Sequence, residues 1–310
     1  MSTSERIVKA NGVELCVESF GDPADPAVLL IHGAGHSLLA WDEDFVGRLV
    51  AGGRQVIRYD SRDAGRSTGY PAGSPAYGLG DLVADAAALL DALGITAAHV
   101  VGMSQGAAVA QLLALDHADR VASLTLASST PGGPGHHHPD LPAMSQEIQE
   151  LFANEPAEPD WSDRAAVIDY LVEAERPFAA RSRPFDTDGM RAAAERVVER
   201  TADIAAQLTN PYLIDAGEPW RGRLGQVGAR TLVLHGTEDP LFPIGHGRAL
   251  AAEIPGARFT PLEQAGHEVF PRHQWDLVIP AILDHTAGRS LGHQALASPG
   301  PKRRRHNSFG

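Results

Sequence analysis

Short, unbroken apolar runs alternate along this chain with longer stretches in which apolar residues recur at helical spacing. Unbroken apolar runs are typical of strands that are covered on both faces of a sheet. The alternation therefore predicts a mostly parallel sheet with helices on both faces, an α/β fold. The predicted strands are residues 27–32, 55–59, 98–101, 121–127, 231–235 and 258–262. The predicted helices are residues 41–50, 81–93, 107–114, 164–175, 191–206, 246–253 and 273–285.

The chain starts with a different pattern. Residues 7–20 contain two short strand-like runs around Asn11-Gly12, a strong signal for a two-residue hairpin turn. Cys16 alternates there with glutamates, so we expect it on the less buried face of its strand. It is the only cysteine, which excludes an intrachain disulfide and fits a reducing compartment.

The strand–helix alternation pauses at Pro131 and resumes after Gly228. The segment between them is rich in Pro, Glu, Asp and Ala and carries helical patterns. We therefore expect a core formed by residues 1–130 and 229–286, with residues 131–228 inserted as a helical cap. Residues 287–310 are rich in Gly, Ser and Pro and end in KRRRHNSFG, which predicts a disordered, solvated tail.

Composition narrows the possible partners. The 310 residues are 43% hydrophobic and carry a formal net charge of −13, which argues against a nucleic-acid partner. The first residues lack the apolar stretch of a signal peptide, and no apolar run is long enough to span a membrane. These features predict a cytoplasmic protein without a membrane partner. They do not fix its oligomeric state.

One five-residue motif suggests the chemistry. Gly102-Met103-Ser104-Gln105-Gly106 lies between a predicted strand and a predicted helix, the context that makes G-x-S-x-G a nucleophile elbow. The sharp turn exposes the serine hydroxyl above the sheet, and small residues are required two positions before and after it. The following helix directs free N–H groups towards the serine. Ser104 is therefore the candidate nucleophile.

A serine nucleophile needs a base and a group that orients the base, and both candidates follow predicted strands late in the chain. Asp239 comes after the strand at 231–235, and His267 lies in a loop after the strand at 258–262. The carboxyl ends of parallel strands meet at the edge where ligands bind. The neighbouring Glu238 is the alternative acid. We favour Asp239 because its shorter side chain suits a partner held directly beneath the imidazole.

The developing negative charge of such a reaction needs backbone N–H donors. The amide of Gln105, directly after the nucleophile, is the first candidate. The sequence His32-Gly33-Ala34-Gly35 follows an early strand, and we assign the Ala34 amide as the second.

Two further groups of polar residues could be functional. Asp60 and Arg62 could be a second acid and a substrate clamp, but strand-end ion pairs commonly brace loops, and we favour that reading. The run at residues 136–138 is three histidines. Consecutive extended side chains point in alternate directions, so a solvated loop is expected there rather than a metal site. We expect neither metal nor cofactor.

The segments FGDPADPAVLL, QVIRYDSRDAGRST, AHVVGMSQGA and ALDHADRVASLTL are similar to those of the α/β-hydrolase superfamily, and more narrowly to the aclacinomycin (anthracycline) methylesterase group. The resemblance implies Ser104 as nucleophile, Asp239 as acid and His267 as base, with oxyanion amides at Ala34 and Gln105. It also implies a small-molecule ester substrate, such as a methyl ester of a polyketide-like compound.

The leading hypothesis is a cofactor-independent serine hydrolase that cleaves a carboxylic ester through an acyl-enzyme. The same three residues also serve C–C bond hydrolases and perhydrolases, so these remain alternatives. A different class is a small-molecule-binding protein with slow turnover on the same scaffold.

Overall fold

The computed structural model describes residues 5–133, 138–154 and 156–287. In these ranges, eight strands form one sheet in the order β1-β2-β4-β3-β5-β6-β7-β8. The pairs β1–β2 and β2–β4 are antiparallel, and all other neighbours are parallel. The strands are β1 Arg6–Ala10, β2 Val13–Phe20, β3 Ala27–Ile31, β4 Gln55–Tyr59, β5 Ala98–Met103, β6 Val121–Ala127, β7 Thr231–Gly236 and β8 Arg258–Leu262. The predicted α/β sheet is thus confirmed, strand by strand.

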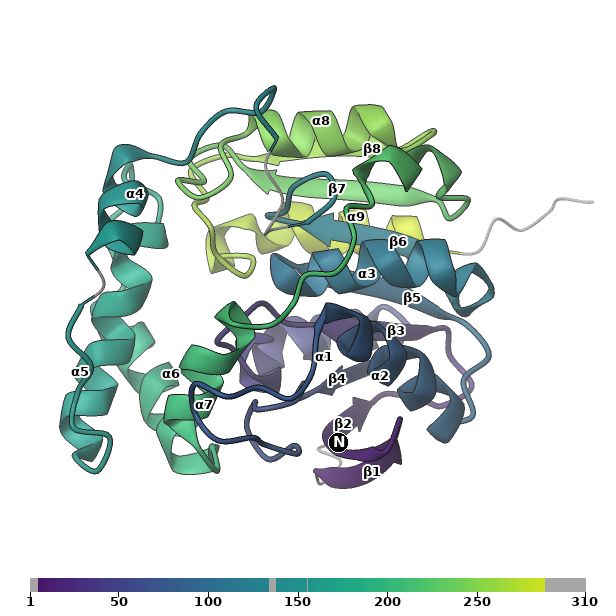
Figure 1. The fold of residues 1–310 in the computed structure, drawn as a ribbon. Coiled ribbons are helices and arrows are strands. Elements are labelled where there is room, and N and C mark those ends of the chain that lie inside the picture. Colours follow the sequence, from purple (N-terminus) through teal and green to yellow (C-terminus); the bar gives the residue numbers. More distant parts are fainter. Residues whose placement is uncertain (1–4, 134–137, 155, 288–310) are drawn as a thin grey trace, which may run out of the picture.

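Helices cover both faces of this sheet (Figure 1). On one face, α1 Glu43–Ala51 and α9 Trp275–Thr286 pack against alternate residues of the central strands. On the other face lie α2 Leu79–Ala92, α3 Gln105–Asp116 and α8 Gly245–Glu253. Both faces of β3 are therefore buried, which is why its sequence is apolar without a break.

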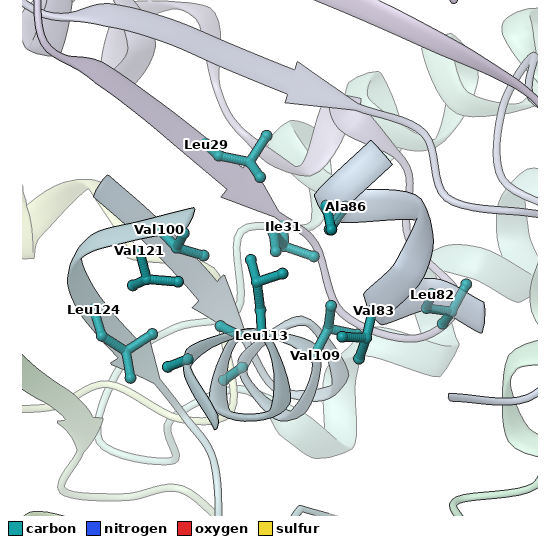
Figure 2. Packing of buried hydrophobic residues seen from close by; sticks show 14 of the residues in the cluster. Leu29, Ile31, Leu82, Val83, Ala86, Val100, Val109, Leu113, Val121 and Leu124 are labelled. Atoms are coloured by element: carbon teal, nitrogen blue, oxygen red, sulfur yellow. The ribbon is translucent and has the colours of Figure 1, made fainter. Parts of the chain in front are cut away.

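The packing around α3 is shown in Figure 2. Val109 and Leu113 of α3 lie against Ile31 of β3 and Val100 of β5, and Val83 of α2 closes the cluster. All five side chains are at most 4% exposed. Burial of one such Val, Leu or Ile side chain stabilises the fold by about 1.5–3 kcal/mol. The helix that follows the candidate nucleophile is thus firmly fixed to the sheet.

The segment 131–228, here called the cap region, joins β6 to β7. Its helices are α4 Gln146–Ala153, α5 Arg164–Glu175, α6 Thr187–Arg200 and α7 Ile204–Thr209. They stand together on one side of the sheet, at the left of Figure 1. Helices α5 and α6 pack through a small apolar cluster of their own, formed by Ile168, Val172 and Ala194. None of the helices in the described ranges is long and apolar enough to cross a bilayer.

The prediction of a single helix at residues 191–206 is wrong. Helix α6 ends at Arg200, and a new helix starts after Asp203, whose carboxylate accepts a hydrogen bond from the Ala206 amide. Asp is a preferred N-cap residue because its side chain satisfies a free amide of the first turn. The expected tail begins at residue 287, and residues 288–310 lie outside the described part of the chain.

The predicted hairpin is confirmed, but the prediction for Cys16 within it is wrong. Asn11 and Gly12 form the turn between β1 and β2 with positive φ values of 47° and 78°. Cys16 is only 1% exposed. Its strand face, expected to be open, is covered by the loop after β4 and by Arg200, whose Nη2 lies 3.4 Å from the Cys16 Sγ. Strand periodicity alone could not show that distant segments cover this face.

Cys16 should therefore report on unfolding. Burial, together with the negative charge of Asp60, raises the pKa of its thiol to about 12. We expect the folded protein to react with an aromatic disulfide reagent about a thousandfold more slowly than the urea-unfolded chain, because reaction requires opening of the structure. The release of the coloured thiol measures both rates. Equal rates in buffer and in urea would contradict this burial.

Candidate active site

The candidate nucleophile lies at a strained turn. Ser104 joins β5 to α3 with φ 53° and ψ −117°, a conformation that costs a non-glycine residue about 1–3 kcal/mol. A Cβ atom on Gly102 would lie 2.3 Å from the Gly106 carbonyl oxygen, and one on Gly106 would lie 2.2 Å from the Ile31 oxygen. The tight packing therefore requires glycine at both positions of the motif, as the sequence predicted.

Three predicted side chains meet at the carboxyl edge of the sheet. The Ser104 Oγ lies 3.0 Å from Nε2 of His267, and Nδ1 of His267 lies 2.9 Å from Oδ2 of Asp239. Asp239 follows β7, and His267 follows β8, its neighbour in the sheet. Asp239 and His267 are 4% and 8% exposed, so this chain of hydrogen bonds is largely shielded from water.

Contacts of Asp239 fix the direction of the hydrogen bonds. Its Oδ1 accepts hydrogen bonds from the amides of Leu241 (3.0 Å) and Phe242 (2.8 Å). Burial alone would raise the pKa of Asp239, but its contact with His267 and the hydrogen bond from the Phe242 amide hold it below the usual range. The carboxylate is therefore ionised and accepts from the Nδ1–H of His267. This leaves Nε2 free to accept the hydroxyl proton of Ser104.

The alternative acid, Glu238, points elsewhere. Its Oε2 accepts a hydrogen bond of 2.9 Å from the Ser182 amide in the cap region. The Asp239 turn has another buried neighbour, His235 of β7, whose Nε2 donates to the Phe242 carbonyl oxygen at 2.6 Å. Burial lowers the pKa of His235, despite the charge of Asp239 nearby. A neutral His235 thus supports the turn that presents Asp239.

The loop after β3 passes close to the nucleophile. A Cβ atom on Gly33 would lie 3.2 Å from Sδ of Met103 and 3.4 Å from Cβ of Ser104, so the loop packs closely against the elbow. Ala34 is the next residue, and Gln105 is the first residue of α3. The side chain of Gln105 is turned towards the cap region, where its Nε2 donates to the Pro211 carbonyl oxygen at 2.9 Å. The backbone of Gln105 thus adjoins Ser104, and Ala34 follows the glycine that approaches it.

Asp60 and Arg62 brace loops, as expected, although not through each other. Asp60 is fully buried and accepts hydrogen bonds from the Leu38 and Arg66 amides and from Arg200. Arg62 forms a two-pronged ion pair with Asp85 of α2, with both N–O distances at 2.8 Å. The contact of Asp60 with Arg200 links the core to the end of α6.

The sequence did not predict how the cap region holds the His267 loop. The His267 amide donates to the Phe178 carbonyl oxygen at 2.8 Å, and the rings of Phe178 and Phe242 lie 6.1 and 5.4 Å from the imidazole. Nη2 of Arg183 forms an ion pair with Glu268 and donates to both carboxylate oxygens, at 3.0 and 2.8 Å. The only signal in the sequence was the charge of Glu268 directly beside His267.

The predicted absence of a metal site concerned residues 136–138. Residues 136 and 137 lie outside the described part of the chain. Within the described ranges, no three His, Cys, Asp or Glu side chains are arranged to hold a metal ion.

Comparisons with known proteins identify the family. The family model described as "alpha/beta hydrolase fold" matches residues 26–274. The chain is 35% identical to the rhodomycin D methylesterase DnrP of Streptomyces peucetius and 34% identical to DauP of Streptomyces sp. (strain C5). Each alignment covers 92% of this chain and 99% of the relative. The enol-lactonase from Burkholderia xenovorans LB400 has a similar structure, with a TM-score of 0.69 at 25% identity over 90% of this chain and 99% of that one. The chain belongs to the α/β-hydrolase family.

Proposed function

We propose that this protein is a serine hydrolase that cleaves a carboxylic ester through an acyl-enzyme. The hydrogen-bonded series Ser104–His267–Asp239, with distances of 3.0 and 2.9 Å, carries the proposal. Ser104 is the nucleophile, His267 the general base and Asp239 the group that orients and stabilises the imidazolium. Similarity to two methylesterases along nearly the whole chain supports an ester as the substrate.

The reaction has two halves. His267 takes the hydroxyl proton of Ser104 as Oγ forms a bond to the ester carbonyl carbon, and it then returns that proton to the departing alcohol. A water molecule, deprotonated by His267, next attacks the acyl-enzyme and releases the acid and the free serine. The amides of Ala34 and Gln105 would stabilise the oxyanion of each tetrahedral intermediate, and each such donor lowers the barrier by about 3 kcal/mol.

The cap region would determine which ester is accepted. Phe178 contributes an aromatic ring and a backbone contact beside His267, and Gln105 binds the cap region through Pro211. Residues 131–228 therefore form a cap over the reacting groups in this proposal. The named relatives act on rhodomycin D, and a methyl ester of a polyketide-like small molecule is the substrate class that we propose for this chain.

Covalent labelling combined with turnover tests the proposal. We expect a fluorophosphonate to add its phosphonyl group to the peptide that carries Ser104, seen as a mass shift, and to abolish hydrolysis in proportion to labelling. A panel of esters that includes polyketide methyl esters then measures steady turnover. An unlabelled Ser104 in an active preparation would refute the mechanism. Labelling without turnover of any ester would instead favour a binding protein, and turnover of a C–C substrate alone would favour a C–C hydrolase.

A further inference from the structure

The loop that carries the predicted donor Ala34 is a tight turn. The His36 amide donates to the Gly33 carbonyl oxygen at 3.3 Å, and Gly35 has the positive φ of 74° that the third position of a type II turn requires. The Gly33 carbonyl and the Ala34 N–H belong to the same planar peptide group, so the bond from the His36 amide to the Gly33 oxygen holds that group in place. The orientation of this peptide group determines where the Ala34 amide points.

The cap region holds this turn from outside. The side chain of Gln207 in α7 donates to the Gly35 carbonyl oxygen at 3.1 Å. The Tyr212 hydroxyl lies 3.5 Å from the Ala34 carbonyl oxygen. A third contact runs through His36, whose Nε2 lies 3.2 Å from Oε1 of Glu175 at the end of α5. The turn is thus connected to two cap helices, α5 and α7.

Both ring nitrogens of His36 face groups that can only accept a hydrogen bond. Nδ1 lies 3.1 Å from the Ala34 carbonyl oxygen, and Nε2 faces the Glu175 carboxylate. A neutral imidazole has one N–H group and one lone pair, so it cannot satisfy both contacts. Only the imidazolium donates at both ends.

Electrostatics around the pair favour this protonation state. Burial alone would lower the pKa of His36, but the charge of Glu175 and the two hydrogen bonds raise it above its ordinary value. Burial would likewise raise the pKa of Glu175, but the charge of His36 and its hydrogen bond hold it low. Of the other titratable groups, His32 interacts with His36, and Tyr212 interacts with Glu175. Burial lowers the pKa of His32 to about 4, so His32 is neutral.

We propose that His36 is a positioning residue, held as an imidazolium between the Ala34 carbonyl and the Glu175 carboxylate, which fixes the Ala34 amide towards the reacting carbonyl and ties that donor to the cap. The inference rests on the proposed function, because it assigns the Ala34 amide to the oxyanion. It adds a condition: the donor is correctly aimed only while Glu175 of the cap is in place.

This arrangement predicts a loss of rate at alkaline pH. When His36 loses a proton, the remaining N–H stays with the negative Glu175, and the lone pair on Nδ1 then faces the Ala34 oxygen. The repulsion displaces His36 from the turn and weakens the bond from its amide to the Gly33 oxygen, which holds the Ala34 N–H in place. On the alkaline side of the profile, activity is therefore retained below the raised pKa of His36 and is lost as the pH rises through it.

Kinetics of three variants test this. We expect His36→Ala to lower kcat for a short-chain ester by about tenfold, less than the 10²–10³ of a complete donor loss, with KM changed less than about twofold. Glu175→Gln should move the alkaline loss of kcat to lower pH and keep activity at the acid end of the profile. Glu173→Gln is the matched control, since Glu173 lies on the same helix and pairs with exposed Arg176. Its profile should match the wild type. Circular dichroism verifies that each variant is folded.

Nitrogen chemical shifts measure the protonation state of the His36 ring directly. The His36 signals in long-range proton–nitrogen spectra are assigned by their absence in His36→Asn. Both ring nitrogens of His36 should be protonated at pH 7. In Glu175→Gln, His36 should lose a ring proton at a lower pH than it does in Glu173→Gln. A bare ring nitrogen at pH 7, or identical profiles for the two glutamine variants, would overturn the inference. If His36→Ala keeps full kcat while Ser104→Ala has none, the inference alone fails. If Ser104→Ala stays active, the proposed function fails, and the spectra still decide the charge of His36.

Discussion

Ser104→Ala is expected to lower kcat for a short-chain chromogenic ester by about 10⁶-fold, the scale seen when a serine hydrolase loses its nucleophile. Without the hydroxyl, no acyl-enzyme can form, and only substrate binding and the oxyanion amides remain to accelerate attack by water. Release of the coloured alcohol measures the rate. Because Ser104 and His267 act together, adding His267→Ala to Ser104→Ala should cause little further loss.

The control for this variant is Ser129→Ala. Ser129 is buried, and its hydroxyl lies 3.4 Å from the carbonyl oxygen of Ser104. This variant perturbs the same turn but leaves the Ser104 hydroxyl intact, so we expect it to keep most of the activity. Undiminished turnover in Ser104→Ala, or an equal loss in Ser129→Ala, would show that the Ser104 hydroxyl is not the nucleophile.

The parts of the structure that the sequence predicted well depend on local chemistry. The elbow at Ser104 could be predicted because Gly102 is required by contacts with Gly106 and Ala107 within the turn itself, whereas Gly106 is required by the approach of Ile31 and His32. The hairpin around Asn11 follows from positive φ values that Asn and Gly tolerate. The strands of the sheet were recognisable because burial on both faces leaves them unbroken apolar runs.

The parts that could not be predicted depend on segments distant along the chain. Cys16 is buried by a loop after β4 and by Arg200, which a pattern confined to its own strand does not contain. The contact between His36 and Glu175 likewise joins the loop after β3 to a cap helix. The packing of the cap region on the core determines such contacts, and the weak apolar pattern of residues 131–228 did not specify that packing.

Asp239→Asn is expected to lower kcat by about 10⁴-fold, a loss second only to that of Ser104→Ala. The side-chain carbonyl oxygen of Asn can still accept the hydrogen bonds from the Leu241 and Phe242 amides, so the turn is preserved. Its NH₂ group then faces Nδ1 of His267 and donates to it. The imidazole consequently carries its proton on Nε2, where it points at Ser104 and cannot accept the hydroxyl proton.

Glu238→Gln is the matched control because it makes the same acid-to-amide change at the adjacent residue. Glu238 contacts the Ser182 amide in the cap region, whereas Asp239 contacts His267 at 2.9 Å. We expect Glu238→Gln to retain activity within a few-fold of the wild type, with kcat and KM measured on the same ester and folding checked by circular dichroism. Activity lost in Glu238→Gln and kept in Asp239→Asn would reverse the assignment of the acid. Because the two side chains are neighbours in the sequence and differ in what they contact, the pair of variants separates the orientation of His267 from the general loss of a negative charge in this loop.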